Sequence, residues 1–194
     1  MKTLSTLMMN EFIAMSCGNL SIVLEEGESY SEDEIKQHVN KLLFDYKMLV
    51  NPVGMKIVLS QEKQNSLRTA RIYLLRMCTS LLDMKSYDDV REIVNEMGWH
   101  CEKMSIDDLD RKVKSELRRL EYESKRSKAS QDSEKEQNEA SPQEIISMFD
   151  KEQAALMTYF KMCISMDSIT AAVYANMVAQ AEREIAIRNK SLGH

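Results

Sequence analysis

The feature that most limits what this chain can fold into is its shortage of turn-forming residues. Only five glycines and two prolines occur among its 194 residues. Sandwiches, barrels and doubly wound α/β folds need turn residues after most of their strands, and this sequence has too few of them for such a fold. The sequence therefore predicts an all-α fold, a helical bundle with a long C-terminal helix. A chain of this length can bury a hydrophobic core without disulfides.

Charge and cysteine content narrow the expected partners and compartment. The formal net charge is −5, with 26 basic and 31 acidic residues, so no overall attraction to nucleic acid or anionic lipid is expected. The longest uncharged apolar stretch, 168–181, is shorter than the roughly 20 residues of a membrane-spanning helix, so no membrane contact is predicted. The four cysteines are scattered, as free thiols are in a reducing compartment, so the predicted location is the cytoplasm or an assembly built in the cytoplasm.

Helix start and stop signals organise the first part of the chain. Ser31 and Glu34 form a capping box, which opens a helix expected to run to about residue 50. Pro52 disfavours the helical conformation of the residue before it and should end this helix. A short extended piece is expected over 53–59.

The next helix is expected over 60–84 and has one apolar face. The residues on this face are Leu67, Ala70, Leu74, Met77, Cys78 and Leu81. A short helix that Gly98 ends should follow it and complete an antiparallel helical hairpin.

A further helix is expected from about residue 105, because apolar residues recur there at steps of three or four. These residues are Ile106, Leu109, Val113, Leu117 and Leu120. Past Tyr122 the apolar positions disappear, and a segment with nothing to bury is either a connector or a solvated helix. The predicted organisation is a helical globular part (1–122), a charged polar connector or solvated helix (123–140) and a long C-terminal helix (141–194).

The C-terminal helix has the strongest start signal of the chain, a capping box from Ser141 to Glu144 with Pro142 at the first helical position. No helix-breaking residue occurs before Gly193. Over 154–181 its circumference is mostly apolar or small, so this helix either packs back on its own chain or assembles with other chains, and its excess of apolar surface favours partner chains. The residues predicted to make these protein contacts are Leu156, Phe160, Ile164, Ala171, Ala175, Met177 and Ala179.

Catalytic, metal and cofactor signatures are absent from the sequence, and no such site is predicted. Trp99, His100 and Cys101 adjoin, but zinc sites need recurring ligand pairs two to four residues apart. The sequence has no glycine-rich phosphate loop and no nucleophile elbow. An enzyme that uses unrecognised histidine chemistry would be expected to depend on His100.

These patterns favour a non-enzymatic structural or adaptor subunit of a larger intracellular assembly, whose partners are other protein chains, either copies of itself or members of a larger assembly. A component of a viral particle or of its assembly machinery is one concrete form of this hypothesis. The alternative is a small regulatory protein that contacts DNA or RNA through arginine-bearing helices, with Arg68, Arg71 and Arg118 as the contact residues. Acidic residues interleave with these arginines, which is typical of solvated helix faces and makes nucleic acid the less favoured partner.

Overall fold

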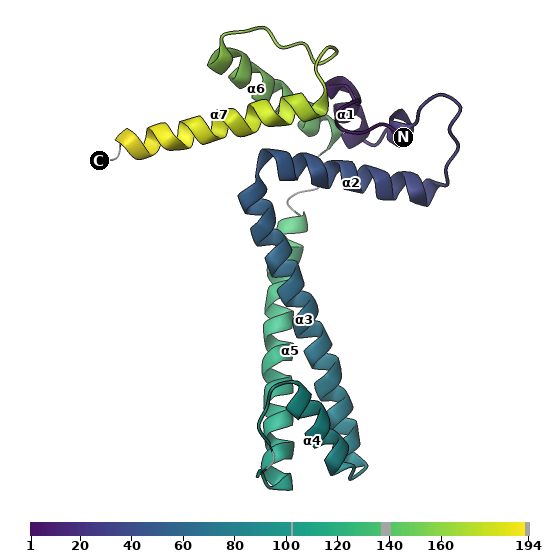
Figure 1. Cartoon of the computed structure of the whole chain (residues 1–194), viewed down its shortest axis with the longest axis vertical. Helices are drawn as coiled ribbons and strands as arrows, with labels where there is room; N and C mark the ends of the chain where they lie inside the picture. Colours follow the sequence, from purple (N-terminus) through teal and green to yellow (C-terminus); the bar gives the residue numbers. More distant parts are fainter. Residues whose placement is uncertain (102, 137–140, 193–194) are drawn as a thin grey trace. The chain divides into compact units, whose positions relative to one another are not determined.

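The structure is a computed structural model that describes residues 1–101, 103–136 and 141–192. The described residues form seven α-helices and a 3-10 turn, and no strand beyond an isolated bridge between Met8 and Thr170. The predicted all-α fold is therefore confirmed. In chain order the elements are α1 (Met9–Ser16), the 3-10 turn η1 (Leu20–Val23), α2 (Glu32–Val50), α3 (Pro52–Asp83), α4 (Tyr87–Glu96), α5 (Ile106–Glu136), α6 (Pro142–Phe160) and α7 (Ala171–Leu192), as Figure 1 shows. Within the same residues, no helix has both the length and the apolar character needed to cross a membrane.

The chain forms two compact units, which differ from the predicted division at residues 122 and 140. Unit 1 combines Met1–Ile57 with Glu139–His194, and unit 2 is the continuous stretch Val58–Asn138. Helical periodicity identifies the apolar face of each helix but not the distant helix that will cover it, so the pairing of the two chain ends could not be deduced from local patterns.

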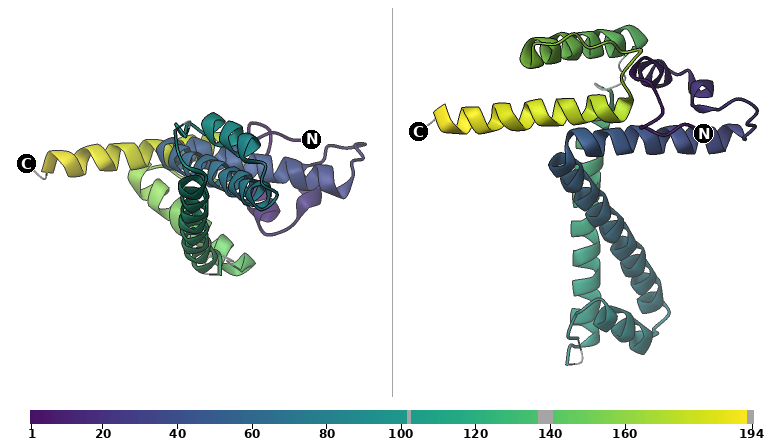
Figure 2. Two further views of the ribbon diagram at one scale, coloured as in Figure 1. Left: turned by 90° about the horizontal axis from the view of Figure 1, so that it is seen from below. Right: turned by 45° about the horizontal axis from the view of Figure 1, so that its top comes forward.

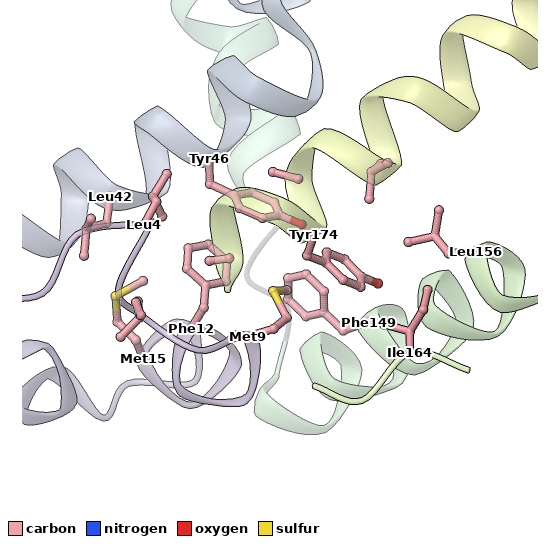
Figure 3. Close-up of a cluster of buried hydrophobic side chains, with 14 of the residues drawn as sticks. Leu4, Met9, Phe12, Met15, Leu42, Tyr46, Phe149, Leu156, Ile164 and Tyr174 are labelled. Atoms are coloured by element: carbon pink, nitrogen blue, oxygen red, sulfur yellow. The ribbon is translucent and has the colours of Figure 1, made fainter. Parts of the chain in front are cut away.

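Unit 1 is built from α1, α2, α6 and α7, and the C-terminal part of α2 packs against the first turns of α7 (Figure 2). Its core centres on aromatic rings from three helices. Phe12 stacks on Tyr46 with ring centroids 4.4 Å apart, and Phe149 meets both rings edge-on at 6.3 and 6.4 Å (Figure 3). Such aromatic pairs add roughly 0.5–1.5 kcal/mol beyond the burial of their area.

The predicted single helix after Ser141 is wrong, because the chain breaks it into α6 and α7. Lys161 ends α6 in a left-handed conformation, with φ 53°. The Nε2 amide of Gln153 on α6 donates to the backbone oxygen of Ile164 (2.7 Å) and holds the connecting loop. At the start of α7, the amides of Ala171 and Ala172 donate to carbonyl oxygens near the N-terminus of the chain. Contacts from the other end of the sequence thus satisfy the first turn of α7.

The capping boxes at Ser31 and Ser141 are confirmed, since each serine accepts a hydrogen bond from the amide of the glutamate three residues later. The extended piece predicted over 53–59 is wrong, because these residues belong to α3. The side chain of Asn51 accepts a hydrogen bond from the Gly54 amide (2.9 Å) and so caps α3 at its start. Pro52 ends α2 as predicted, but it also occupies the first helical position of the next helix, where proline is favoured.

Unit 2 contains the remainder of α3 together with α4 and α5, and α5 runs beside α3 (Figure 1). Its buried residues are Ile72, Leu75, Cys78 and Leu82 of α3, Val90 and Val94 of α4, Cys101, and Leu109, Val113 and Leu120 of α5. The helix α5 continues through residue 136. The segment 123–136 of the predicted connector is therefore helical, and 137–140 lies outside the described residues.

Candidate protein-interaction surface

The residues predicted to contact other chains lie mostly in the core of unit 1. Leu156, Ile164, Ala171, Ala175 and Ala179 are buried there. Phe160 and Met177 are partly buried and pack against the same core. The apolar circumference of 154–181 is therefore largely covered within this chain, because the break after α6 lets both helices pack against α1, α2 and the N-terminal segment.

An apolar stripe on α3 is left uncovered in unit 2. We define the α3 stripe as Leu67, Ala70, Leu74, Met77, Leu81 and Met84, which follow one another at steps of 3, 4, 3, 4 and 3 residues. Leu67, Met77 and Met84 expose 56, 47 and 66 % of their surface, and only Leu81 packs partly against the core. Met84 directly follows α3, and its amide still donates to the Ser80 carbonyl (3.1 Å).

The stripe is exposed because α3 carries two apolar faces and buries the other one. The residues buried in unit 2 are centred about a third of a turn away from the stripe, at 100° per residue. The sequence placed Cys78 on the same apolar face as Leu67, Ala70, Leu74 and Met77, but the structure buries Cys78 and leaves the other four exposed. Ile72, Leu75 and Leu82 also recur at helical spacing, but nothing local ranks one face above the other.

The borders of the stripe differ in character. On one side lie the exposed residues Ser66, Tyr73 and Ser80, and on the other lie Arg71 and the buried Cys78. Neither border carries an acidic residue of α3, but Arg119 and Glu123 of α5 line a pocket together with Leu67 and Arg71. The stripe is an apolar seam with a mainly uncharged rim, the composition of a helix-packing surface.

The structure does not bring the three predicted nucleic-acid-contacting arginines together. Arg68 and Arg71 line one pocket of about 350 Å³ beside Glu123, whereas Arg118 lines another pocket with Asp107 and other residues of α5.

Acidic residues lie close to these arginines and to their neighbours. Arg68 donates to Asn65 (2.9 Å) and lies 3.8 Å from the Glu123 carboxylate. Arg76 forms an ion pair with Glu121 at 2.7 Å. Hydrogen bonds from Arg119, followed by the charges of neighbouring basic residues that include Arg71, lower the pKa of Glu116. Carboxylate side chains therefore lie close to the arginines on these helix faces.

A cluster of polar atoms lies inside unit 1 and was not anticipated from the sequence. It comprises the phenols of Tyr46 and Tyr174 and the carboxylate of Glu152, and the hydroxyl of Tyr46 points toward the ring of Tyr174 (Figure 3). Among the described residues, neither phenol oxygen nor Oε1 of Glu152 has a hydrogen-bond partner of good geometry. Burial is the main cause that raises the pKa of Glu152, and the charge of Glu182 adds to it, while the nearby phenol of Tyr174 opposes it.

The groups that could support catalysis or metal binding are dispersed over the described residues. No three metal-ligating side chains gather within that part of the chain. His38 Nε2 lies 2.8 Å from the backbone oxygen of Lys2 and links α2 to the N-terminal segment, and His100 is exposed. All four cysteines are free thiols. Comparisons of the chain with protein families, with curated proteins and with solved structures find no match.

Proposed function

We propose that this chain is a non-enzymatic adaptor or structural subunit that binds another protein chain through the α3 stripe. The observation that carries the proposal is that Leu67, Met77 and Met84 stay about half exposed or more while they follow one helical seam. The other apolar face of α3 already packs against α4 and α5. A contiguous apolar stripe on a folded unit is typical of a protein-binding surface.

The chemistry of the stripe favours a protein helix as the ligand. Leucine and methionine side chains at steps of three and four residues present the ridges that another helix packs against. Methionine is unbranched and polarizable, so Met77 and Met84 can adjust their shape to a partner. The nearby Arg68 and Arg76 already contact Glu123 and Glu121, so they add little unpaired positive charge beside the stripe.

Site-specific photo-crosslinking in cells tests this proposal with little change to the surface. Tyr73 borders the stripe and exposes 64 % of its surface, while Tyr122, on α5 of the same unit and outside the stripe, exposes 70 %. Each would be replaced, in separate full-length chains, by a photoreactive phenylalanine analogue of similar size. Irradiation is followed by mass spectrometry of the adducts.

The proposal predicts a defined protein adduct from position 73 that is much weaker from position 122. The position-73 adduct should also disappear when Leu74→Glu and Met77→Glu are added to the same chain. Absence of a protein adduct at position 73, or equal adducts at both positions, would contradict the proposal. Crosslinking to nucleic acid instead would support the regulatory alternative.

A further inference from the structure

The spacing of the α3 stripe reads the same in both directions. Its steps of 3, 4, 3, 4 and 3 residues are unchanged when the helix is reversed. A second α3 helix, turned end for end, therefore offers an apolar residue at the same height as each one in the first helix. This is the geometry that a two-fold symmetric, isologous interface requires.

Side-chain size supports the reversed pairing as well. With the centre between Leu74 and Met77, these two residues oppose each other across the two-fold axis, and Leu67 opposes Met84. Ala70, the one small residue of the stripe, then opposes Leu81. A small residue facing a large one fills the space between helices, whereas a parallel, in-register pair would place Ala70 against Ala70 and leave a gap.

The borders of the stripe are compatible with self-association. In the reversed arrangement, the border with Ser66, Tyr73 and Ser80 lies beside the same border of the second copy. The two Tyr73 phenols are then neighbours, and this border brings no charged residues of α3 together. The other border brings Arg71 next to the Cys78 position of the second copy. The two Arg71 side chains are then about nine residues apart along the axis, or about 13 Å at 1.5 Å per residue. The two Arg71 side chains are therefore kept apart.

From this spacing, size pattern and charge pattern, we propose that the partner of the α3 stripe is a second copy of this chain, packed antiparallel about a two-fold axis between Leu74 and Met77. The inference rests on the proposed function, since it names the occupant of the same surface. The stripe is about 25 Å long, so the interface is at the small end of the range for specific complexes. We expect a reversible dimer with a dissociation constant in the micromolar range.

The first test measures the mass of the full-length protein by sedimentation equilibrium over a micromolar to millimolar concentration range. The mass should rise from that of one chain to that of two. A Leu74→Glu, Met77→Glu variant should raise the dissociation constant at least tenfold. Val173→Glu is the matched control, because Val173 is an exposed apolar residue of α7 in unit 1, and it should dimerise as the wild type does.

Circular dichroism of each variant checks that it remains folded. If the double glutamate variant unfolds, Leu74→Gln with Met77→Gln replaces it, because uncharged polar side chains disturb the helix less. A wild type that stays monomeric throughout, or a folded double variant that dimerises normally, overturns the proposal.

A disulfide test fixes the orientation of the pair. Chains with Leu67→Cys and chains with Met84→Cys, both with Cys17→Ser and Cys163→Ser, are given different tags, mixed and oxidised. The antiparallel dimer predicts mainly the mixed disulfide between positions 67 and 84. Predominant disulfides between identical positions would overturn the antiparallel arrangement.

The two proposals can fail separately. If photo-crosslinking at position 73 gives an adduct with a different protein and the purified chain is monomeric, the stripe remains an adaptor surface and the dimer is wrong. If position 73 gives no protein adduct and the chain is monomeric, both are wrong.

Discussion

At the scale of single residues, the most consequential side chain of unit 1 is Glu152. Its carboxyl group is held near Tyr46 and Tyr174, and burial raises its pKa. The folded state therefore binds this proton more tightly than the unfolded chain does. The stabilisation from this difference is fully present below the unfolded-state pKa and is lost as the pH rises through the folded-state pKa.

We expect Glu152→Gln to increase the free energy of unfolding at neutral pH, because it removes the cost of ionising a partly buried carboxyl group. The wild type should lose stability as the pH rises through the mildly acidic range, and the same substitution should reduce this loss. Urea denaturation at a series of pH values measures both effects. Asp150→Asn, at an exposed position of α6, is the control for the loss of one negative charge and should change the neutral-pH stability by no more than about 0.5 kcal/mol. A fall in neutral-pH stability for Glu152→Gln would contradict this account.

Lys161 offers a second test at this scale, because a left-handed conformation costs a non-glycine residue roughly 1–2 kcal/mol. Lys161→Gly should therefore stabilise the protein by about 1 kcal/mol. Lys151→Gly, at an exposed position inside α6, should instead cost about 0.5–1 kcal/mol, because glycine disfavours the helix interior. Thermal and urea unfolding would compare the two variants. If both variants changed the free energy of unfolding by the same amount in the same direction, the left-handed conformation of Lys161 would not be the cause.

The sequence predicted some helix ends correctly and missed others. The serines that begin α2 and α6 were identified because a capping box is completed within four residues. The end of α6 at Lys161 was missed because lysine has no preference for the left-handed region. The hydrogen bonds that fix the loop and the start of α7 come from Gln153 and from the N-terminal segment, and no local pattern contains them.

At the scale of helices, α3 shows why an apolar face need not be a buried face. Both of its stripes have helical spacing, and unit 2 supplies only α4 and α5 to cover them. The periodicity found the helix and both sets of residues. It could not decide between them, since that choice depends on where the residues of α5 meet α3.

Two adjacent leucines of α3 separate the faces cleanly. Leu75 is fully buried, and Leu74 is exposed in the stripe. Leu75→Ala should reduce the free energy of unfolding by about 2–5 kcal/mol, whereas Leu74→Ala should change it by no more than about 0.5 kcal/mol. Denaturation at concentrations below the dimerisation range measures both. A larger loss of unfolding free energy for Leu74→Ala than for Leu75→Ala would mean that Leu74, and not Leu75, lies in the core of unit 2.

At the scale of the whole molecule, the chain has two separate hydrophobic cores. The described core of unit 1 draws on α1, α2, α6 and α7, and that of unit 2 on α3, α4 and α5. The all-α class followed from composition. The assignment of helices to cores did not, because unit 1 joins segments from opposite ends of the sequence.

Because the two cores are separate, a destabilising substitution in one unit should leave the other unit folded. Native-state hydrogen exchange can measure this. Phe12→Ala should cost about 3–5 kcal/mol and speed amide exchange in α1, α2 and α7 while α4 and α5 remain protected. Leu75→Ala should give the reverse pattern. Uniform loss of protection from either substitution would show that the two units unfold as one.

The discontinuous make-up of unit 1 also sets an order of events during translation. The residues of unit 2 emerge from the ribosome as an unbroken stretch, so their core can close while the rest of the chain is still being made. The first helices of unit 1 have to wait for α6 and α7, which follow unit 2 in the sequence. Until then Phe12 and Tyr46 lack Phe149 and the helices that bury them, so their rings stay open to solvent while unit 2 is being made.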